Sequence, residues 1–362
     1  MQTHSNFRLL VVRLGAMGDI LHALPAVTAL RLAHPDWVID WVVEPRWQAL
    51  LAADGSVERL PVWSPAQPLV DHLIFAATKQ WRKAPFSRKT IREFNTLRRS
   101  LKSGEYDAVI DLQGAIRSAI VARLAGCKRL IGEAEPRERL ACNLFSERVS
   151  TKGIHVIDQD FELVSAIAGD QLTHVAPWLP IDPAAESWAD QIHPPSTNNP
   201  AVLINPGAGW GAKRWPVDRY AAVAKELINH GCSVLINAGP GEEPLAAIIA
   251  TQTGGQAKTL SCTLPQLIAI TRRISLAIAG DTGPLHLACA LGKPVVGIYG
   301  PTDPSRNGPY GTRFVVLRSP ESRRDHTRRE VPEAGLLTIQ PGDVLCAADS
   351  LLYPETASKA GL

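Results

Sequence analysis

Short apolar runs alternate with stretches of helical spacing along most of the chain. An apolar run at 9–12 ends in a glycine-rich turn at 15–19, a helical pattern continues to Pro35, and residues 37–44, WVIDWVVE, have the pattern of a second strand. Strand, turn, helix and strand in this order form a βαβ unit. The pattern therefore predicts a parallel sheet with a right-handed crossover.

The alternation restarts after a polar stretch in the middle of the chain. Residues 106–114 predict another buried strand, and the helix that follows ends at Gly126. Residues 181–200 are rich in Pro, Ser and Asn without a sustained period, which predicts a linker. Beyond it, strands are expected at 201–209, 232–239, 276–283 and 294–300, and helices at 217–231, 242–250, 263–274 and 283–292.

This order of elements predicts two doubly wound α/β domains in tandem that face each other across a cleft. A length of 362 residues also exceeds what one hydrophobic core usually supports. The expected domains are 1–180 and 201–340, followed by a last helix within 341–362 whose packing the sequence leaves open. Ligands of such sheets bind beyond the carboxyl ends of the strands, where the glycine-rich turns lie.

Composition changes this picture little. Hydrophobic residues make up 45% and charged residues 20% of the chain, and the formal net charge is +3, all ordinary for a globular protein. Six cysteines lie far apart without a CxxC pair, which favours reduced thiols in a reducing compartment. The first apolar run is too short for a signal peptide or membrane span. We therefore expect a cytosolic protein whose membrane contact, if any, is peripheral.

The strongest chemical motif follows a predicted strand of the second domain, at residues 280–286. Thr282 and Gly283 would present backbone N–H groups at a helix start, which favours anionic oxygens, and His286 could add a donor one turn later. An ordinary turn capped by Asp281 is the plainer explanation. Glycines on both sides of the polar pair and the nearby histidine favour an anion site.

Two other turns of the second domain carry candidate groups. Small residues at 205–209 would let a phosphate approach the backbone, and Lys213 is placed to meet its charge, whereas Arg214 is expected in solvent. Glu242, in the turn at 239–243, could accept hydrogen bonds from ribose hydroxyls. A helix cap explains this carboxylate equally well.

In the first domain, the turn at 15–19 matches neither the GxGxxG spacing of dinucleotide folds nor a P-loop. NAD-dependent and ATP-dependent activities are therefore disfavoured. Asp19 stands at a helix start, where the helix dipole stabilises a carboxylate and where capping is an equal alternative. Its expected position facing the interdomain cleft favours a functional role.

Basic residues concentrate between 79 and 102, where nine lysines and arginines accompany one acidic residue, Glu93. Such runs are usually solvated helix faces. Here Trp81 and Phe86 interrupt the charge, which suits an anionic amphiphile such as a phosphorylated lipid or membrane headgroups. Nucleic acid is less favoured because no nucleic-acid module accompanies the run. No acidic cluster has metal-ligand spacing, so no metal is expected.

Together these motifs resemble the lipopolysaccharide heptosyltransferases, inverting transferases of the GT-B architecture. The matching segments are 13–27, 81–87, 106–119, 212–216 and, as the longest, 280–311. Residues 81–87 and the DLQG segment look most like heptosyltransferase I, which acts on the Kdo sugar attached to lipid A. Residues 323–330, RRDHTRRE, depart from the family where paired cysteines are expected.

The resemblance implies a role for each matching residue. Asp19 would deprotonate the acceptor hydroxyl, and Lys213 would neutralise the departing diphosphate. The implied donor contacts are Thr282, Gly283 and His286 on the pyrophosphate, Asp281 near the sugar, and Glu242, or equally Glu243, on the ribose. The implied acceptor contacts are Arg82, Lys83 and Arg117, which would face phosphates and carboxylates.

The resemblance also implies the reaction partners. ADP-heptose would be the donor and Kdo-lipid A the acceptor, with no separate cofactor and no nucleic acid, at the cytoplasmic face of the inner membrane. Heptosyltransferase II, a transferase for another nucleotide sugar, and a noncatalytic nucleotide- or lipid-binding protein are the alternatives.

Overall fold

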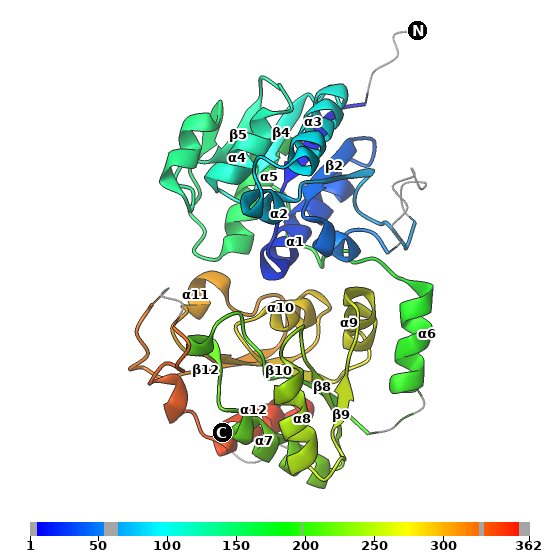
Figure 1. Cartoon of the computed structure of the whole chain (residues 1–362), viewed down its shortest axis with the longest axis vertical. Helices are drawn as coiled ribbons and strands as arrows, with labels where there is room; N and C mark the ends of the chain where they lie inside the picture. Colours follow the sequence, from blue (N-terminus) through cyan, green and yellow to red (C-terminus); the bar gives the residue numbers. More distant parts are fainter. Residues whose placement is uncertain (1–5, 54–63, 196, 198, 326–328, 355–362) are drawn as a thin grey trace. The chain divides into compact units, whose positions relative to one another are not determined.

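The computed structural model describes residues 6–53, 64–195, 197, 199–325 and 329–354. The chain divides into two compact units, Met1–Asp182 and Pro183–Leu362. Figure 1 shows the elements of both. Among the described residues no helix is both long enough and apolar enough to span a bilayer.

The N-terminal unit is built on a parallel sheet with the strand order β3-β2-β1-β4-β5-β6. The strands are β1 (Arg8–Val12), β2 (Val38–Val43), β3 (His72–Phe75), β4 (Ala108–Asp111), β5 (Leu130–Glu133) and β6 (Glu147–Val149). Its helices are α1 (Met17–Ala33), α2 (Thr78–Lys83), α3 (Arg88–Ser103), α4 (Ile116–Arg123) and α5 (Val156–Ala168), with 3₁₀ turns η1 (Pro45–Leu50) and η2 (Arg139–Leu144). β2 and β4 are buried along their whole length, so their sequences do not alternate between apolar and polar residues. A single aspartate, Asp40 within β2 and Asp111 at the end of β4, interrupts each otherwise apolar strand.

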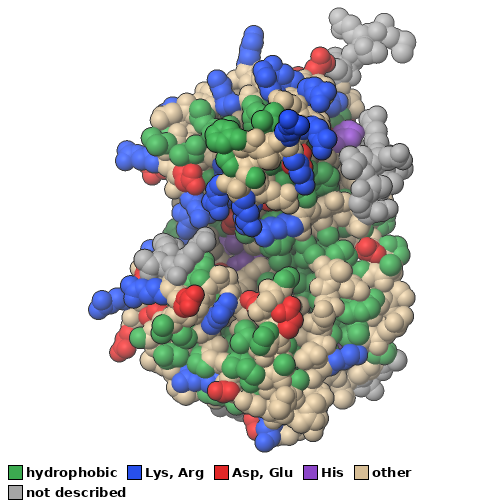
Figure 2. Space-filling view, viewed as in Figure 1, with side chains coloured by type: hydrophobic (Ala, Val, Ile, Leu, Met, Phe, Trp, Pro, Cys, Tyr) green, Lys and Arg blue, Asp and Glu red, His purple; other side chains and the backbone are tan. Residues whose placement is uncertain are grey.

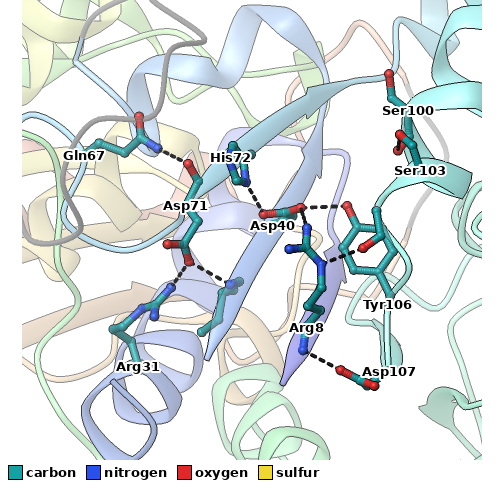
Figure 3. Close-up of polar contacts among 12 residues, drawn as sticks. Arg8, Arg31, Asp40, Gln67, Asp71, His72, Ser100, Ser103, Tyr106 and Asp107 are labelled. Atoms are coloured by element: carbon teal, nitrogen blue, oxygen red, sulfur yellow. Dashed lines mark hydrogen bonds and ion pairs between the residues drawn. The ribbon is translucent and has the colours of Figure 1, made fainter. Parts of the chain in front are cut away.

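A buried polar network ties α1, β2 and β3 together in this unit (Figure 3). Asp40 of β2 accepts a hydrogen bond from the Tyr106 hydroxyl at 2.7 Å and lies 2.8 Å from Nδ1 of His72. Asp71 binds Nη2 of Arg31, from α1, at 2.5 Å, and both side chains are almost fully buried. Buried carboxylates of this kind are tolerated because each is hydrogen-bonded and lies near an arginine, Arg8 at 3.8 Å for Asp40 and Arg31 for Asp71.

The C-terminal unit repeats the same architecture with the strand order β12-β11-β10-β7-β8-β9, again parallel. The strands are β7 (Ala201–Asn205), β8 (Ser233–Asn237), β9 (Lys258–Leu260), β10 (Leu276–Gly280), β11 (Val295–Tyr299) and β12 (Phe314–Arg318). The helices are α6 (Pro183–Ile192), α7 (Val217–Asn229), α8 (Glu243–Gln252), α9 (Leu264–Thr271), α10 (Gly283–Ala290), α11 (Pro304–Asn307) and α12 (Pro341–Leu352), with 3₁₀ turns η3 (Gly211–Lys213) and η4 (Leu336–Thr338). The prediction of two doubly wound α/β domains of the GT-B type is confirmed.

The last helix, which the sequence left unplaced, belongs to the core of the second unit. Val344 and Leu351 of α12 join the cluster that Leu227 of α7 forms with Val202 and Ile204 of β7. α12 therefore lies beside α7 against the sheet.

The predicted linker at 181–200 is wrong in one respect, because residues Pro183–Ile192 form α6. Ala185 and Ala189, four residues apart, are buried, and α6 packs on α9. Glu186 forms ion pairs with Arg272 and Arg273 of the segment that follows α9, at 2.5 and 2.6 Å. Proline is compatible with a first helical turn, so the prolines that suggested a linker do not prevent this helix.

Candidate active site

A cluster of three charged or titratable side chains lies at the carboxyl edge of the second sheet. β7 and β10 are neighbouring strands, and η3 and the turn at Asp281 follow them. Nζ of Lys213 forms an ion pair with Oδ2 of Asp281, and Nε2 of His286 lies 3.3 Å from Oδ1. The side chains of Lys213 and Asp281 are each 11% exposed and that of His286 is 6% exposed. The structure thus brings together Lys213, predicted to neutralise the departing diphosphate, and two residues predicted for donor binding, Asp281 and His286.

The cluster is electrostatically asymmetric. Burial of Asp281 favours its neutral form, but the hydrogen bond with His286 and the charge of Lys213 outweigh burial and hold the pKa of this carboxyl well below its usual range. Asp281 is therefore ionised at neutral pH and orients both partners. Nζ of Lys213 also lies 4.2 Å from the centre of the Trp210 ring, a cation–π contact.

The start of α10 adjoins this cluster. Thr282 is the N-cap residue of α10, but its side chain does not cap the helix; its hydroxyl donates to the Gly280 carbonyl at 3.2 Å instead. Gly283 and Pro284 open the helix, and both are only partly buried. First-turn N–H groups without a side-chain cap, together with the helix dipole, favour an anionic ligand.

Glu242 lies at the neighbouring strand ends. Its Oε2 accepts a hydrogen bond from the Gly239 N–H at 3.0 Å, and a Cβ added to Gly207 would lie 1.9 Å from the same oxygen. Any side chain at position 207 would therefore force the Glu242 carboxylate to move. Glu243, the other carboxylate that the sequence left open, is the exposed first residue of α8. Glu242 is thus the one that lies against the 205–209 turn.

The segment that departs from the family pattern, 323–330, packs against η3; its residues 326–328 lie outside the described residues. The N–H of Ala212 donates to the Arg329 carbonyl at 2.9 Å, and a Cβ on Gly211 would lie 1.7 Å from the Glu330 carbonyl oxygen. This contact fixes the turn that carries Lys213. Arg214, expected in solvent, is exposed.

In the first unit, Asp19 follows β1 in the first turn of α1. Its Oδ2 accepts a hydrogen bond from the Ala16 N–H at 2.9 Å. This oxygen therefore caps α1, which is the alternative that the sequence left open. Nε of Arg13 donates to the Asp19 carbonyl at 2.9 Å. In the described part of the chain Oδ1 accepts no hydrogen bond, and the residue is only partly buried. The carboxylate can therefore cap α1 and still present one oxygen outward.

The basic residues expected at the acceptor separate into two groups. Arg82 and Arg117 line one pocket of about 500 Å³, whereas Lys83 does not line it. Figure 2 shows Lys and Arg side chains gathered on the face of the N-terminal unit that carries α2 and α3. Nε1 of Trp81 donates a hydrogen bond to Glu93 at 2.8 Å, so the one acidic side chain of the basic segment 79–102 is already hydrogen-bonded.

Sequence reasoning assigned no role to Asp111 and Gln113 of the DLQG segment, where Asp111 is the last residue of β4 and Gln113 follows it. Oε1 of Gln113 accepts from the Leu14 N–H at 2.8 Å and so joins the ends of β1 and β4. Burial raises the pKa of Asp111 to about 6 although Ser118 and two backbone N–H groups donate to it. A carboxylate at the end of a fully apolar strand is the signal that could have found it.

Comparisons with known proteins identify the family of the chain. The family described as glycosyltransferase family 9 (heptosyltransferase) matches residues 94–336. The chain belongs to this family. It is 31% identical to lipopolysaccharide heptosyltransferase 1 of Escherichia coli K12, covering 86% of this chain and 94% of that protein. It is 26% identical to lipopolysaccharide heptosyltransferase 2 of the same strain, covering 97% and 100%. The membership predicted from the sequence motifs is confirmed.

The solved structures agree. E. coli heptosyltransferase WaaC with ADP matches 95% of this chain and 100% of its own, with a TM-score of 0.76 and 26% identity. E. coli ADP-heptose heptosyltransferase II matches 97% of this chain with a TM-score of 0.72 and 22% identity, which speaks to the fold. This glycosyltransferase family 9 protein therefore shares its fold across almost the whole chain with heptosyltransferases.

Proposed function

We propose that this glycosyltransferase transfers heptose from ADP-heptose to a Kdo residue of Kdo-lipid A, as heptosyltransferase I does. The observation that carries the proposal is the Lys213–Asp281–His286 cluster beside the uncapped start of α10. A heptosyltransferase with solved ADP and ADP-2-deoxy-2-fluoro-heptose complexes is similar along 95% of this chain, which supports ADP-heptose as the donor. The sequence identity of 31% to heptosyltransferase 1, against 26% to heptosyltransferase 2 of the same strain, supports Kdo-lipid A as the acceptor.

The second unit would stabilise the leaving group. Cleavage of a sugar–diphosphate bond leaves negative charge on the diphosphate, and fixed N–H dipoles and one ammonium group oppose that charge without reorganisation. Lys213 is paired with Asp281. The diphosphate would share Lys213, while Asp281 keeps its contact with His286 and holds both groups in place. Because Lys213 and the α10 N–H groups take up the charge, the proposed reaction needs no metal.

The first unit would bind the acceptor and remove its proton. A carboxylate is a weak base that works only in contact with the hydroxyl, and Asp19 has an oxygen outside the α1 cap for this contact. Attack from the face opposite the diphosphate inverts the anomeric centre. Glu242 would accept bonds from the ribose, and Arg82 and Arg117 would meet acceptor phosphates at the inner-membrane surface.

The test is a matrix of donors and acceptors read by mass spectrometry. Purified protein is incubated with ADP-heptose or UDP-sugars, each with Kdo-lipid A or with Kdo-lipid A that already carries one heptose. We expect addition of one heptose only for ADP-heptose with Kdo-lipid A, at a rate that excess EDTA leaves within about twofold. Transfer only to the heptosylated acceptor would identify a type II enzyme and refute the acceptor. ADP binding without transfer to any acceptor would refute the catalytic proposal.

A further inference from the structure

A pocket of about 500 Å³ lies in the N-terminal unit among α2, α3 and the start of α4. Trp81, Pro85, Ile91 and Phe94 form its apolar wall, and the rings of Trp81 and Phe94 meet edge to face with centres 6.0 Å apart. Thr78 and Thr90 also line the pocket, but their hydroxyls already donate to Glu44 and to the Ala84 carbonyl, at 2.6 and 2.8 Å. The interior is therefore suited to a hydrocarbon.

Cationic groups accompany this apolar interior. Lys79, Arg82 and Arg117 line the same pocket. Within the described ranges neither arginine has an ion-pair partner, and Glu93 is occupied by Trp81 and, at 3.8 Å, by Lys89. Guanidinium groups bind phosphate by paired charged hydrogen bonds. The pocket thus combines an apolar interior with a binding site for an anion.

The surface next to the pocket has the same mixed character. Phe86, between α2 and α3, is 90% exposed, and Ile91 is 50% exposed although it lines the pocket. Exposed apolar side chains among lysines and arginines are typical of surfaces that contact lipid at the headgroup boundary. Figure 2 shows the basic side chains of this face.

We propose that this pocket takes one acyl chain of a phosphorylated lipid while Arg82 and Arg117 bind its phosphate. This inference rests on the proposed function only for the identity of the lipid, which would be the lipid A part of the acceptor. The pocket would be an apolar subsite that binds the lipid part of the acceptor rather than its sugar. Each methylene that the pocket buries should raise affinity about fourfold, from the transfer energy of a CH₂ group.

The first test uses n-alkyl phosphates from hexyl to decyl, below their micelle concentrations, titrated into the full-length protein by calorimetry. We expect affinity to rise about fourfold per methylene. Ile91→Gln should flatten this dependence, whereas Ile154→Gln, the same change at a side chain that is 73% exposed and outside the pocket lining, should retain it. Arg82→Gln should weaken every chain length by the same factor.

Affinity independent of chain length would overturn the proposal, and so would equal effects of Ile91→Gln and Ile154→Gln. Binding to anionic phospholipid vesicles without chain-length dependence would also overturn it, because that result describes a membrane contact without a chain in the pocket.

A second test separates this inference from the proposed function. Heptose transfer is measured with Kdo-lipid A and with its de-O-acylated form. We expect a lower KM for the fully acylated acceptor and a smaller difference in Ile91→Gln. Transfer to both acceptors with equal KM would overturn the acyl subsite alone, whereas absence of transfer to either, with the alkyl-phosphate series intact, would overturn the proposed function alone.

Discussion

Replacing Lys213 by methionine isolates the charge of the central ion pair, because methionine retains most of the side-chain length. Lys213 and Asp281 are each only 11% exposed, so removal of one partner leaves a largely buried charge. Breaking a buried pair in this way costs about 3–5 kcal/mol. Asp281 keeps His286 at 3.3 Å, so the lower end, about 3 kcal/mol, applies here. Asp281→Asn should cost a similar amount because it strands the ammonium group.

The double variant should lose much less than the sum of the single losses, since neither unpaired charge remains. We expect a coupling energy of about 2 kcal/mol between the two positions. Hydrogen exchange of the β10 amides reports the unfolding of the second unit specifically. Lys225→Met, at an exposed position on α7, is the matched control and should change stability by less than about 0.5 kcal/mol.

The same pair predicts a dependence on pH. The folded-state pKa of Asp281 lies below its unfolded value of about 4. The contribution of the ion pair to the free energy of unfolding is therefore complete above about pH 4 and declines as the pH falls below that value. The stabilities of wild type and Lys213→Met should converge in acid. Losses that simply add, or a difference that persists unchanged at pH 3, would refute the reasoning.

Three further changes test other parts of the structure. Gly207→Ala places a Cβ against the Glu242 carboxylate, which would have to move, and should weaken ADP binding at least tenfold in calorimetry. Gly209→Ala, with open space around its Cβ, should bind ADP normally, and equal affinities of the two variants would contradict this packing. Arg31→Met leaves a buried carboxylate without its guanidinium and should cost about 3–5 kcal/mol in urea unfolding; a loss under 1 kcal/mol would mean that this pair contributes little. The pKa of Asp111 is raised to about 6, so its ionisation disfavours the folded state as the pH rises from about 4 to 6. The free energy of unfolding should therefore fall by up to about 3 kcal/mol over this pH range in wild type, and Asp111→Asn should remove that fall. The same pH profile in wild type and variant would contradict this prediction.

The regular parts of the fold could be predicted from the sequence because their patterns are local. The apolar runs of β1, β7 and β10 are continuous, as is typical of buried parallel strands, and only Asp40 interrupts the run of β2. The edge strand β6 is a three-residue segment with two exposed charged side chains, so no apolar pattern marks it. α6 was missed because flanking prolines dominated the composition, although two buried alanines give it an apolar side.

The candidate site was predictable as a set of residues and not as a set of contacts. Lys213 and Asp281 are 68 positions apart, and their pairing depends on β7 and β10 being neighbours in the sheet. Arg82 and Lys83 are adjacent in the sequence, yet only Arg82 lines the pocket, because consecutive helical residues point in different directions. The contact of 329–330 with η3 has no sequence signal at all, since backbone atoms make it.

In the proposed mechanism, Asp19 of the first unit removes the acceptor proton while the second unit holds the donor. Turnover and ADP affinity of Asp19→Asn, measured on the same preparation, test it most directly. Asparagine retains an oxygen for the α1 cap but is not a base. The account predicts that turnover with ADP-heptose and Kdo-lipid A falls at least about a hundredfold while the Kd for ADP stays within twofold of wild type. Turnover that survives the substitution would contradict it.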